Sequence, residues 1–225
     1  MRARRYTGRT MALLDYQRAF LDFAIALDVL RFGEFTLKSG RKSPYFFNSG
    51  LFNTGRSIGR LGYFYAAAIE HSALAYDMVF GPSYKGVPLA VSTVIALSTH
   101  FQSDVPYAFN RKEIKDHGEG GAVVGAHLHG RCLVIDDVIS AGTSVRESVS
   151  LITGHGAKLA GVVIALDRQE RGQGDLSAIA EIEQEFGVPV ASIVCFEDVI
   201  SYMEDKGGYD GMIQRMQEYR RQYGA

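Results

Sequence analysis

The chain has 225 residues, of which 47% are hydrophobic and 22% are charged, and its formal net charge at pH 7 is −1. These are ordinary values for a globular protein, and the length suits one medium-sized domain with a full hydrophobic core. The balanced charge gives no reason to expect a nucleic-acid partner, and no apolar run in the sequence reaches the roughly 18 residues of a membrane span. The two cysteines, Cys132 and Cys195, lie in apolar runs, which favours buried thiols over a disulfide or a metal site.

The first residues are rich in arginine, and no apolar stretch follows that would make them a secretory signal. We expect residues 1–12 to be a disordered extension, with Met11 as an alternative start, and residues 13–225 to form a single domain. A cytoplasmic location is expected. Apolar residues at helical spacing predict a helix over 15–30, and two β-like runs within 34–48 predict a hairpin.

The predicted hairpin carries cations (Lys38, Arg41 and Lys42) beside the aromatic run Tyr45-Phe46-Phe47. Lysines on an exposed hairpin can serve solubility alone, whereas cations beside aromatic faces also suit a flat anionic ring. Beyond the hairpin, helices and strands alternate. We expect helices over 57–72, 87–99, 144–154 and 177–186, strands over 78–81, 107–110, 132–135, 159–166 and 190–194, and two helical stretches at the end. This alternation predicts one α/β domain with a mostly parallel sheet.

The stretch 132–144, CLVIDDVISAGTS, carries the most chemical information. Four apolar residues lead into Asp136 and Asp137, as expected for a buried strand whose carboxyl end borders a ligand site. The small residues 140–144 follow at the start of a predicted helix, where backbone N–H groups bind phosphate. Acceptors for sugar hydroxyls beside a phosphate site together predict a sugar phosphate as the ligand. Paired carboxylates also hold Mg²⁺ in receiver domains and phosphatases, but those proteins lack the phosphate loop directly downstream.

Two other loops bear on this ligand. The loop Ser83-Tyr84-Lys85-Gly86 joins a predicted strand to a helix and is a second candidate anion site. The segment 111–121, RKEIKDHGEGG, is so polar and glycine-rich that we expect a mobile surface loop. A charge run is usually a solvated face, but cations beside glycines also fit a lid that closes over anions. His127 and His129 lack a nearby third ligand, so we expect them to be structural.

The motifs CLVIDDVISAGTS, SYKG, RKEIKDHGEGG, FTLKSGRKSPYFFN and LDRQERG together resemble the orotate phosphoribosyltransferases of the type I phosphoribosyltransferase family. The resemblance covers residues 16–223. It implies an α/β fold with a mostly parallel central sheet flanked by helices, an N-terminal helix-hairpin hood and a flexible catalytic lid loop. It also implies transfer of a phosphoribosyl group from phosphoribosyl pyrophosphate (PRPP) to N1 of orotate, in pyrimidine biosynthesis. Mg²⁺ is expected on the pyrophosphate, with no direct protein ligands, and the expected assembly is a homodimer that shares its lids across subunits.

The resemblance also assigns residue roles. Asp136 and Asp137 hold the ribose hydroxyls, and residues 140–144 wrap the 5′-phosphate. The PRPP-binding set is Lys38, Tyr84, Lys85, Arg111, Lys112, Lys115, His117, Asp136, Asp137, Val138, Ile139, Ser140, Ala141, Gly142, Thr143 and Ser144. The orotate-binding set is Lys38, Phe46, Phe47, Ser140 and Arg168, and the catalytic set is Lys85, Lys115, His117 and Asp137. Ser140 stands where many relatives have threonine, which keeps the hydroxyl.

Two other functions compete with this interpretation. A transferase for a purine or uracil would have no use for Arg168, because a neutral base has no carboxylate to pair with it. A PRPP-sensing regulator would need a recognition helix or a basic face for nucleic acid, and the balanced charge does not indicate one.

Overall fold

A computed structural model describes residues 12–37, 40–115, 121–172, 174 and 176–225 of the chain. Nearly all of the predicted N-terminal extension therefore lies outside the described residues. Helix α1 (Asp15–Ala26) comes first and is followed by the antiparallel hairpin of β1 (Leu30–Thr36) and β2 (Lys42–Phe47), and these three elements form the N-terminal hood. The hairpin confirms the prediction, and the short helix η1 (Ser49–Leu51) follows it.

The predicted first helix was too long at its C-terminal end. The chain turns at Asp28, whose φ is 56°, and the N–H of Val29 donates to the carbonyl of Ala24 at 2.9 Å. From Leu30 the chain continues as a strand. The apolar residues at 29 and 30 fit helical spacing, but the turn places them in the core as part of the hood instead.

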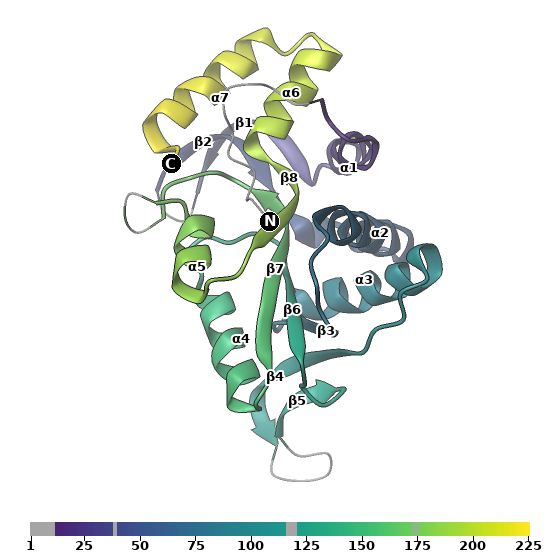
Figure 1. Cartoon of the computed structure of the whole chain (residues 1–225). Coiled ribbons are helices and arrows are strands. Elements are labelled where there is room, and N and C mark those ends of the chain that lie inside the picture. The colour runs from purple at the N-terminus through teal and green to yellow at the C-terminus, as the bar shows by residue number, and fades with distance from the viewer. Residues whose placement is uncertain (1–11, 38–39, 116–120, 173, 175) are drawn as a thin grey trace.

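Six strands form the central sheet in the order β5-β4-β3-β6-β7-β8 (Figure 1). They are β3 (Met78–Gly81), β4 (Tyr107–Lys115), β5 (Gly121–Gly125), β6 (Arg131–Asp136), β7 (Lys158–Asp167) and β8 (Val190–Cys195). Every neighbouring pair is parallel except β4 with β5. The predicted, mostly parallel sheet is confirmed.

The segment 111–121, predicted to be a mobile loop, is partly strand. β4 extends to Lys115 and β5 begins at Gly121, and these two residues pair across the ladder. The prediction was wrong here because an antiparallel edge pair can be polar when its faces are solvated, so composition alone did not reveal it. Residues 116–120 lie outside the described part of the chain.

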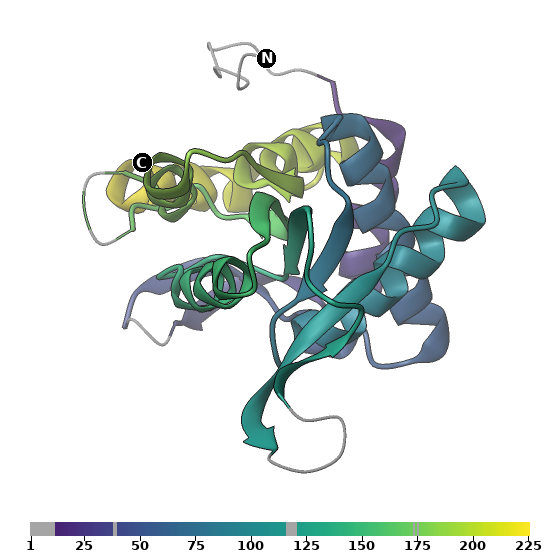
Figure 2. The same cartoon turned by 60° about the horizontal axis from the view of Figure 1, so that its bottom comes forward.

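Helices cover both faces of the sheet (Figures 1 and 2). Helices α2 (Gly55–Ser72) and α3 (Gly86–Phe101) pack on one face, and α4 (Thr143–Gly154) and α5 (Ala178–Phe186) on the other. β6 is buried on both sides because successive side chains alternate: Leu133 faces one cluster and Val134 faces the other. Helices α6 (Phe196–Lys206) and α7 (Asp210–Tyr223) pack beside the hood.

No helix within the described ranges is long and apolar enough to cross a membrane. Cys132 and Cys195 are both buried thiols, as the sequence predicted. Burial raises the pKa of the Cys132 thiol to about 11, so it stays protonated at neutral pH.

Candidate active site

The carboxyl end of β6 presents two aspartates that are almost fully buried: Asp136 is 7% exposed and Asp137 is 9% exposed. Asp136 Oδ2 accepts a hydrogen bond from Ser144 Oγ at 2.9 Å, and its Oδ1 accepts one from the N–H of Asp137 at 2.9 Å. The hydroxyl of Tyr65, in α2, donates to the carbonyl of Asp136 at 2.7 Å and fixes the backbone at the end of β6. Burial, with the neighbouring charge of Asp137, raises the pKa of Asp136 to about 6.

Asp137 joins three separate parts of the chain. Its Oδ2 accepts hydrogen bonds from Lys85 Nζ and from Ser49 Oγ, each at 2.6 Å. Lys85 comes from the loop between β3 and α3, and Ser49 from η1 directly after the hood. The structure therefore brings the lysine and the aspartate predicted from different motifs into contact. Sequence reasoning missed Ser49, because a serine after a strand carries no signal of its own.

Two glycines hold the Lys85 loop tightly against the end of β6. A Cβ on Gly86 would lie 2.5 Å from Pro82 Cδ and 3.0 Å from the carbonyl oxygen of Ile135, and a Cβ on Gly81 would collide with the carbonyl of Gly86. Because there is no room for a side chain at either position, the loop backbone packs directly on the strand that carries the aspartates. This explains how Lys85 reaches Asp137.

The same loop also contacts β4. The N–H of Ser83 donates to Asn110 Oδ1 at 2.7 Å, which anchors the loop to the middle of that strand. Tyr84 is 73% exposed, and the Nζ of Lys112 lies 5.6 Å from the centre of its ring. Arg111 lies next to Lys112 on β4. The cations at the start of the predicted lid thus lie on a strand beside the predicted pyrophosphate loop.

The loop 137–142 runs from β6 into α4, which begins one residue earlier than predicted. Gly142 precedes α4 with a φ of 72°, and a Cβ there would lie 2.8 Å from Ile182 Cδ1. Arg146 Nη1 donates to the carbonyl of Ala141 at 2.6 Å and ties the loop to the helix. The first N–H groups of a helix have no partner within it. Ser140, Ala141 and Thr143 are exposed, so a phosphate can approach the start of this helix.

Arg168 lies at the same edge of the sheet but in a different set of contacts. It directly follows β7. The carbonyl of Asp137 accepts the N–H of Ala165, in β7, at 2.9 Å, and this hydrogen bond holds the end of β7 beside the loop that follows β6. The side chain of Arg168 is 14% exposed and pairs with Glu170 Oε1, which lies 2.6 Å from Arg168 Nη2. Its guanidinium carbon lies 4.4 Å from the centre of the Tyr45 ring. Sequence reasoning did not anticipate Glu170 as its partner.

Phe46 and Phe47 lie on opposite sides of the hairpin, because they are successive residues of β2. Phe47 packs against the core, with its ring centre 6.5 Å from that of Phe20. Phe46 stacks on Phe35 at 5.6 Å. The two rings therefore do not offer a common face to a single planar ligand.

Three predicted residues are placed incompletely or not at all. Lys38 and His117 lie outside the described residues, and only the backbone of Lys115 is described.

His129 Nδ1 lies 2.9 Å from the carbonyl oxygen of His127, beyond the end of β5. Within the described ranges, no group of three or more histidine, cysteine, aspartate or glutamate side chains is arranged to hold a metal ion.

Comparison with known proteins agrees with this geometry. The family model of the phosphoribosyl transferase domain matches residues 64–192. The chain is 57% identical to the orotate phosphoribosyltransferase of Shewanella oneidensis over 209 residues, which make up 93% of this chain and 97% of the relative. It is 58% identical to that of Pseudoalteromonas translucida over 211 residues, 94% and 99% of the two chains.

Solved structures give the same result. The crystal structure of orotate phosphoribosyltransferase from Francisella tularensis matches with a TM-score of 0.85 at 44% identity, covering 92% of this chain and 100% of that one. The Mycobacterium tuberculosis orotate phosphoribosyltransferase in complex with PRPP matches with a TM-score of 0.60 at 22% identity, covering 81% and 98% of the two chains. The second likeness concerns the fold alone.

Proposed function

Since this chain belongs to the orotate phosphoribosyltransferases, we propose that the carboxyl edge of its central sheet, around Asp136, Asp137 and Lys85, is where the reaction of that family takes place. The enzyme is a pentosyltransferase of pyrimidine biosynthesis. It moves the 5-phosphoribosyl group of PRPP to N1 of orotate and yields orotidine 5′-monophosphate and pyrophosphate. The observation that carries the placement is the contact of Lys85 with Asp137 beside the loop 140–144.

For PRPP, we assign the ribose 2′- and 3′-hydroxyls to Asp136 and Asp137, whose side chains are held in place by hydrogen bonds. The 5′-phosphate lies on residues 140–144 at the start of α4, where the helix dipole favours negative charge. Lys85 and Tyr84 then face the pyrophosphate. The three parts of the substrate thereby meet elements that the fold already brings together.

For orotate, we assign the substrate carboxylate to Arg168. Among the described residues, the hydrogen bonds of Arg168 use Nε and Nη2 and leave Nη1 for a ligand. Ser140 is exposed on the phosphate loop and can donate its hydroxyl. The hairpin residues Lys38, Phe46 and Phe47 complete the proposed base site, and because the two rings lie on opposite sides of the hairpin, only one of them can stack on the orotate ring.

The transition state places growing negative charge on the departing pyrophosphate, so cations there lower the barrier rather than only tightening binding. We assign this role to Lys85, and to Lys115 and His117 delivered by the lid. Loss of one such donor costs on the order of 10²–10³ in turnover. A Lys115→Ala variant with nearly normal kcat would remove Lys115 from the mechanism.

Mg²⁺ is proposed to accompany PRPP. This ion keeps several waters and is bound through one or two carboxylates and substrate phosphates rather than by a protein cage. In this proposal the pyrophosphate oxygens carry the ion, and Asp136 and Asp137 stay with the ribose hydroxyls. When bound, the ion neutralises charge on the leaving group.

The assembly is proposed to be a cytoplasmic homodimer in which each lid serves the neighbouring site. Strands β4 and β5, which form the base of the lid, project from the edge of the molecule (Figures 1 and 2), and this geometry supports a contact beyond the subunit. Mixing Lys115→Ala subunits with Asp137→Asn subunits tests it. Activity that returns on mixing supports a shared lid, and activity that stays at the level of the separate variants contradicts it.

The reaction itself is tested by following orotate absorbance with purified protein, PRPP and Mg²⁺. Adenine, hypoxanthine and uracil serve as rival acceptors in parallel reactions. We expect Mg²⁺-dependent loss of orotate and no turnover of the other bases. Turnover of a neutral base at a similar rate would contradict the assignment of Arg168 to a carboxylate.

A further inference from the structure

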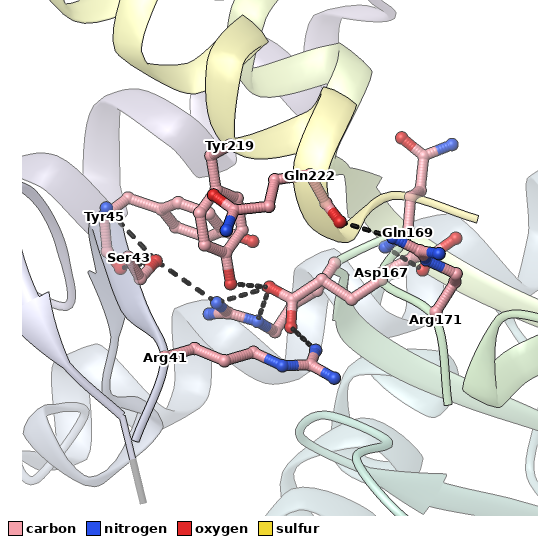
Figure 3. Close-up of polar contacts among 10 residues, drawn as sticks. Arg41, Ser43, Tyr45, Asp167, Gln169, Arg171, Tyr219 and Gln222 are labelled. Carbon is pink, nitrogen blue, oxygen red and sulfur yellow. Dashed lines mark hydrogen bonds and ion pairs between the residues drawn. The ribbon is translucent and has the colours of Figure 1, made fainter. Parts of the chain in front are cut away.

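Arg168 belongs to a cluster in which the hairpin, the end of β7 and α7 meet. Glu170 Oε1 accepts a hydrogen bond from Arg168 Nε at 2.8 Å and lies 2.6 Å from its Nη2. The same oxygen accepts the hydroxyl of Tyr219, from α7, at 2.8 Å. On the hairpin side, Arg41 Nη1 lies 3.4 Å from Glu170 Oε2. Figure 3 shows Arg41 and Ser43 of the hairpin and Tyr219 of α7 converging on these contacts.

A turn after β7 places the charged side chains of Arg168 and Glu170 side by side. Asp167 Oδ1 accepts the N–H of Gln169 at 2.8 Å, and Gln169 has a φ of 51°. A non-glycine residue in this left-handed region is strained, so the surroundings must hold the turn. The end of the chain helps to do so, since the N–H of Ala225 donates to the carbonyl of Gln169 at 3.1 Å.

We propose that Glu170 is a positioning residue for orotate: it holds the Nε/Nη2 side of the Arg168 guanidinium and so turns the Nη1 end toward the substrate carboxylate. This proposal rests on the proposed role of Arg168 as the orotate contact. A guanidinium can bind a carboxylate along its Nε/Nη2 side or across its Nη1/Nη2 end. Glu170 occupies the first of these, and Nη2 also donates to Ser43 Oγ, so a ligand is bound through Nη1.

The other contacts of Arg168 hold the plane of the guanidinium. Its Nη2 donates to Ser43 Oγ at 3.3 Å, and its guanidinium carbon lies 4.4 Å from the centre of the Tyr45 ring. Tyr45 is fully buried and meets Tyr219 edge to face, with ring centres 6.3 Å apart. One tyrosine of α7 therefore supports both the aromatic ring under Arg168 and the carboxylate beside it, and this makes α7 part of the framework of the base site.

A purely structural ion pair is the alternative. Neutralising a largely buried guanidinium is reason enough for a nearby carboxylate, and breaking such a pair destabilises a protein. The two roles differ in what they change. If the role is structural, loss of Glu170 should lower stability and weaken the binding of both substrates to a similar extent. If Glu170 positions Arg168, only the binding of orotate should weaken.

The test is the steady-state kinetics of Glu170→Gln with orotate and PRPP varied in turn. We expect the KM for orotate to rise about tenfold, the change that follows from weakening one charge-assisted contact. The KM for PRPP should stay close to that of the wild type. Glu197→Gln is the matched control, because Glu197 of α6 pairs with Arg220 of α7 and does not contact Arg168. Its two KM values should be unchanged.

Tyr219→Phe and Glu170→Asp complete the design. Tyr219→Phe removes one donor to Glu170 and should raise the KM for orotate by less than Glu170→Gln does. If Glu170→Gln does not fold, Tyr219→Phe provides the test. Glu170→Asp should recover part of the loss. An unchanged KM for orotate in both Glu170→Gln and Tyr219→Phe, or equal rises for both substrates, would overturn the proposal. If the wild type itself does not consume orotate, the proposed function fails rather than this inference.

Discussion

Lys85 Nζ lies 2.6 Å from Asp137 Oδ2, although the two side chains are proposed to serve different parts of PRPP. The lysine side chain is 63% exposed and the aspartate side chain 12%, so the acid is the fixed partner and the lysine the movable one. A pyrophosphate carries more negative charge than one carboxylate and attracts the ammonium group more strongly. PRPP binding should therefore draw Lys85 toward the pyrophosphate and leave Asp137 to accept a ribose hydroxyl.

Replacing Lys85 with glutamine should lower kcat/KM for PRPP by on the order of 10²-fold, since a donor to the leaving group loses its charge. Stability should change by less than about 1 kcal/mol, because the lysine is exposed. Initial rates and thermal unfolding measure the two effects. Lys42→Gln is the control: Lys42 pairs with Glu34 at 2.7 Å on the exposed hairpin, and its loss should leave the rates unchanged. Equal rates for the two variants would remove Lys85 from the site.

Ser49→Ala should raise the KM for PRPP several-fold. Ser49 Oγ donates to Asp137 Oδ2 at 2.6 Å, and a hydrogen bond to a charged group contributes about 1.5–3 kcal/mol when it is shielded from water. Without it, Asp137 keeps Lys85 as its neighbour but loses the contact that orients it from the hood. Ser150→Ala removes a helical serine that bonds only to the carbonyl of Arg146, and it should have wild-type kinetics. A KM that is the same in both variants would show that Ser49 does not orient Asp137.

The parts of the site that are contiguous in the chain were the ones that sequence could predict. The buried run before Asp136, the two acids and the loop to Ser144 form one segment, and its residue types fix both the strand and the start of the helix. Apart from Lys85, the partners that come from distant parts of the chain were missed. Ser49 lies 88 positions from Asp137, and Tyr219 lies 49 positions from Glu170. Such contacts arise from the packing of the hood and α7, which no local pattern encodes.

The fold shows the same division. Apolar runs predicted the parallel strands, because a strand buried on both faces has few other residue choices. Composition failed for the polar end of β4 and its partner β5, where solvated faces remove the apolar signal. It also failed at the end of α1, where Val29 and Leu30 fit a helix as well as the strand that tertiary packing selects.

Gly81→Ala should destabilise the protein by about 1–3 kcal/mol, because the added Cβ meets the carbonyl of Gly86 and the loop must move away from β6. The same displacement should weaken PRPP binding, since Lys85 lies on that loop. Gly59→Ala is the matched control. Gly59 is exposed in α2 with open space around its Cβ position, so alanine there should stabilise the helix by roughly 0.5–1 kcal/mol. Chemical unfolding measures the stability of both variants, and PRPP binding is measured on each. A change in stability of the same sign in Gly81→Ala and Gly59→Ala would contradict this prediction.

Asp167→Asn should make the protein more stable at neutral pH. Burial, with the charges of Glu183, Asp198 and Glu197, raises the pKa of Asp167 to about 6 from its ordinary value of 3.8. The folded protein therefore keeps this proton up to about pH 6, whereas the unfolded chain releases it near pH 4. The stability that the protonated group provides is fully present below pH 4 and is lost as the pH rises through 6.

Asparagine keeps the oxygen that accepts the N–H of Gln169 at 2.8 Å and cannot ionise. The variant should therefore exceed the wild type by on the order of 1–3 kcal/mol at pH 7 and match it near pH 4. Urea unfolding at pH 4, 5, 6 and 7 measures the difference, with the exposed Asp104→Asn as the control for removing one negative charge. A difference that does not grow between pH 4 and pH 7, or a wild type that is the more stable at pH 7, would mean that Asp167 ionises without cost in the folded protein.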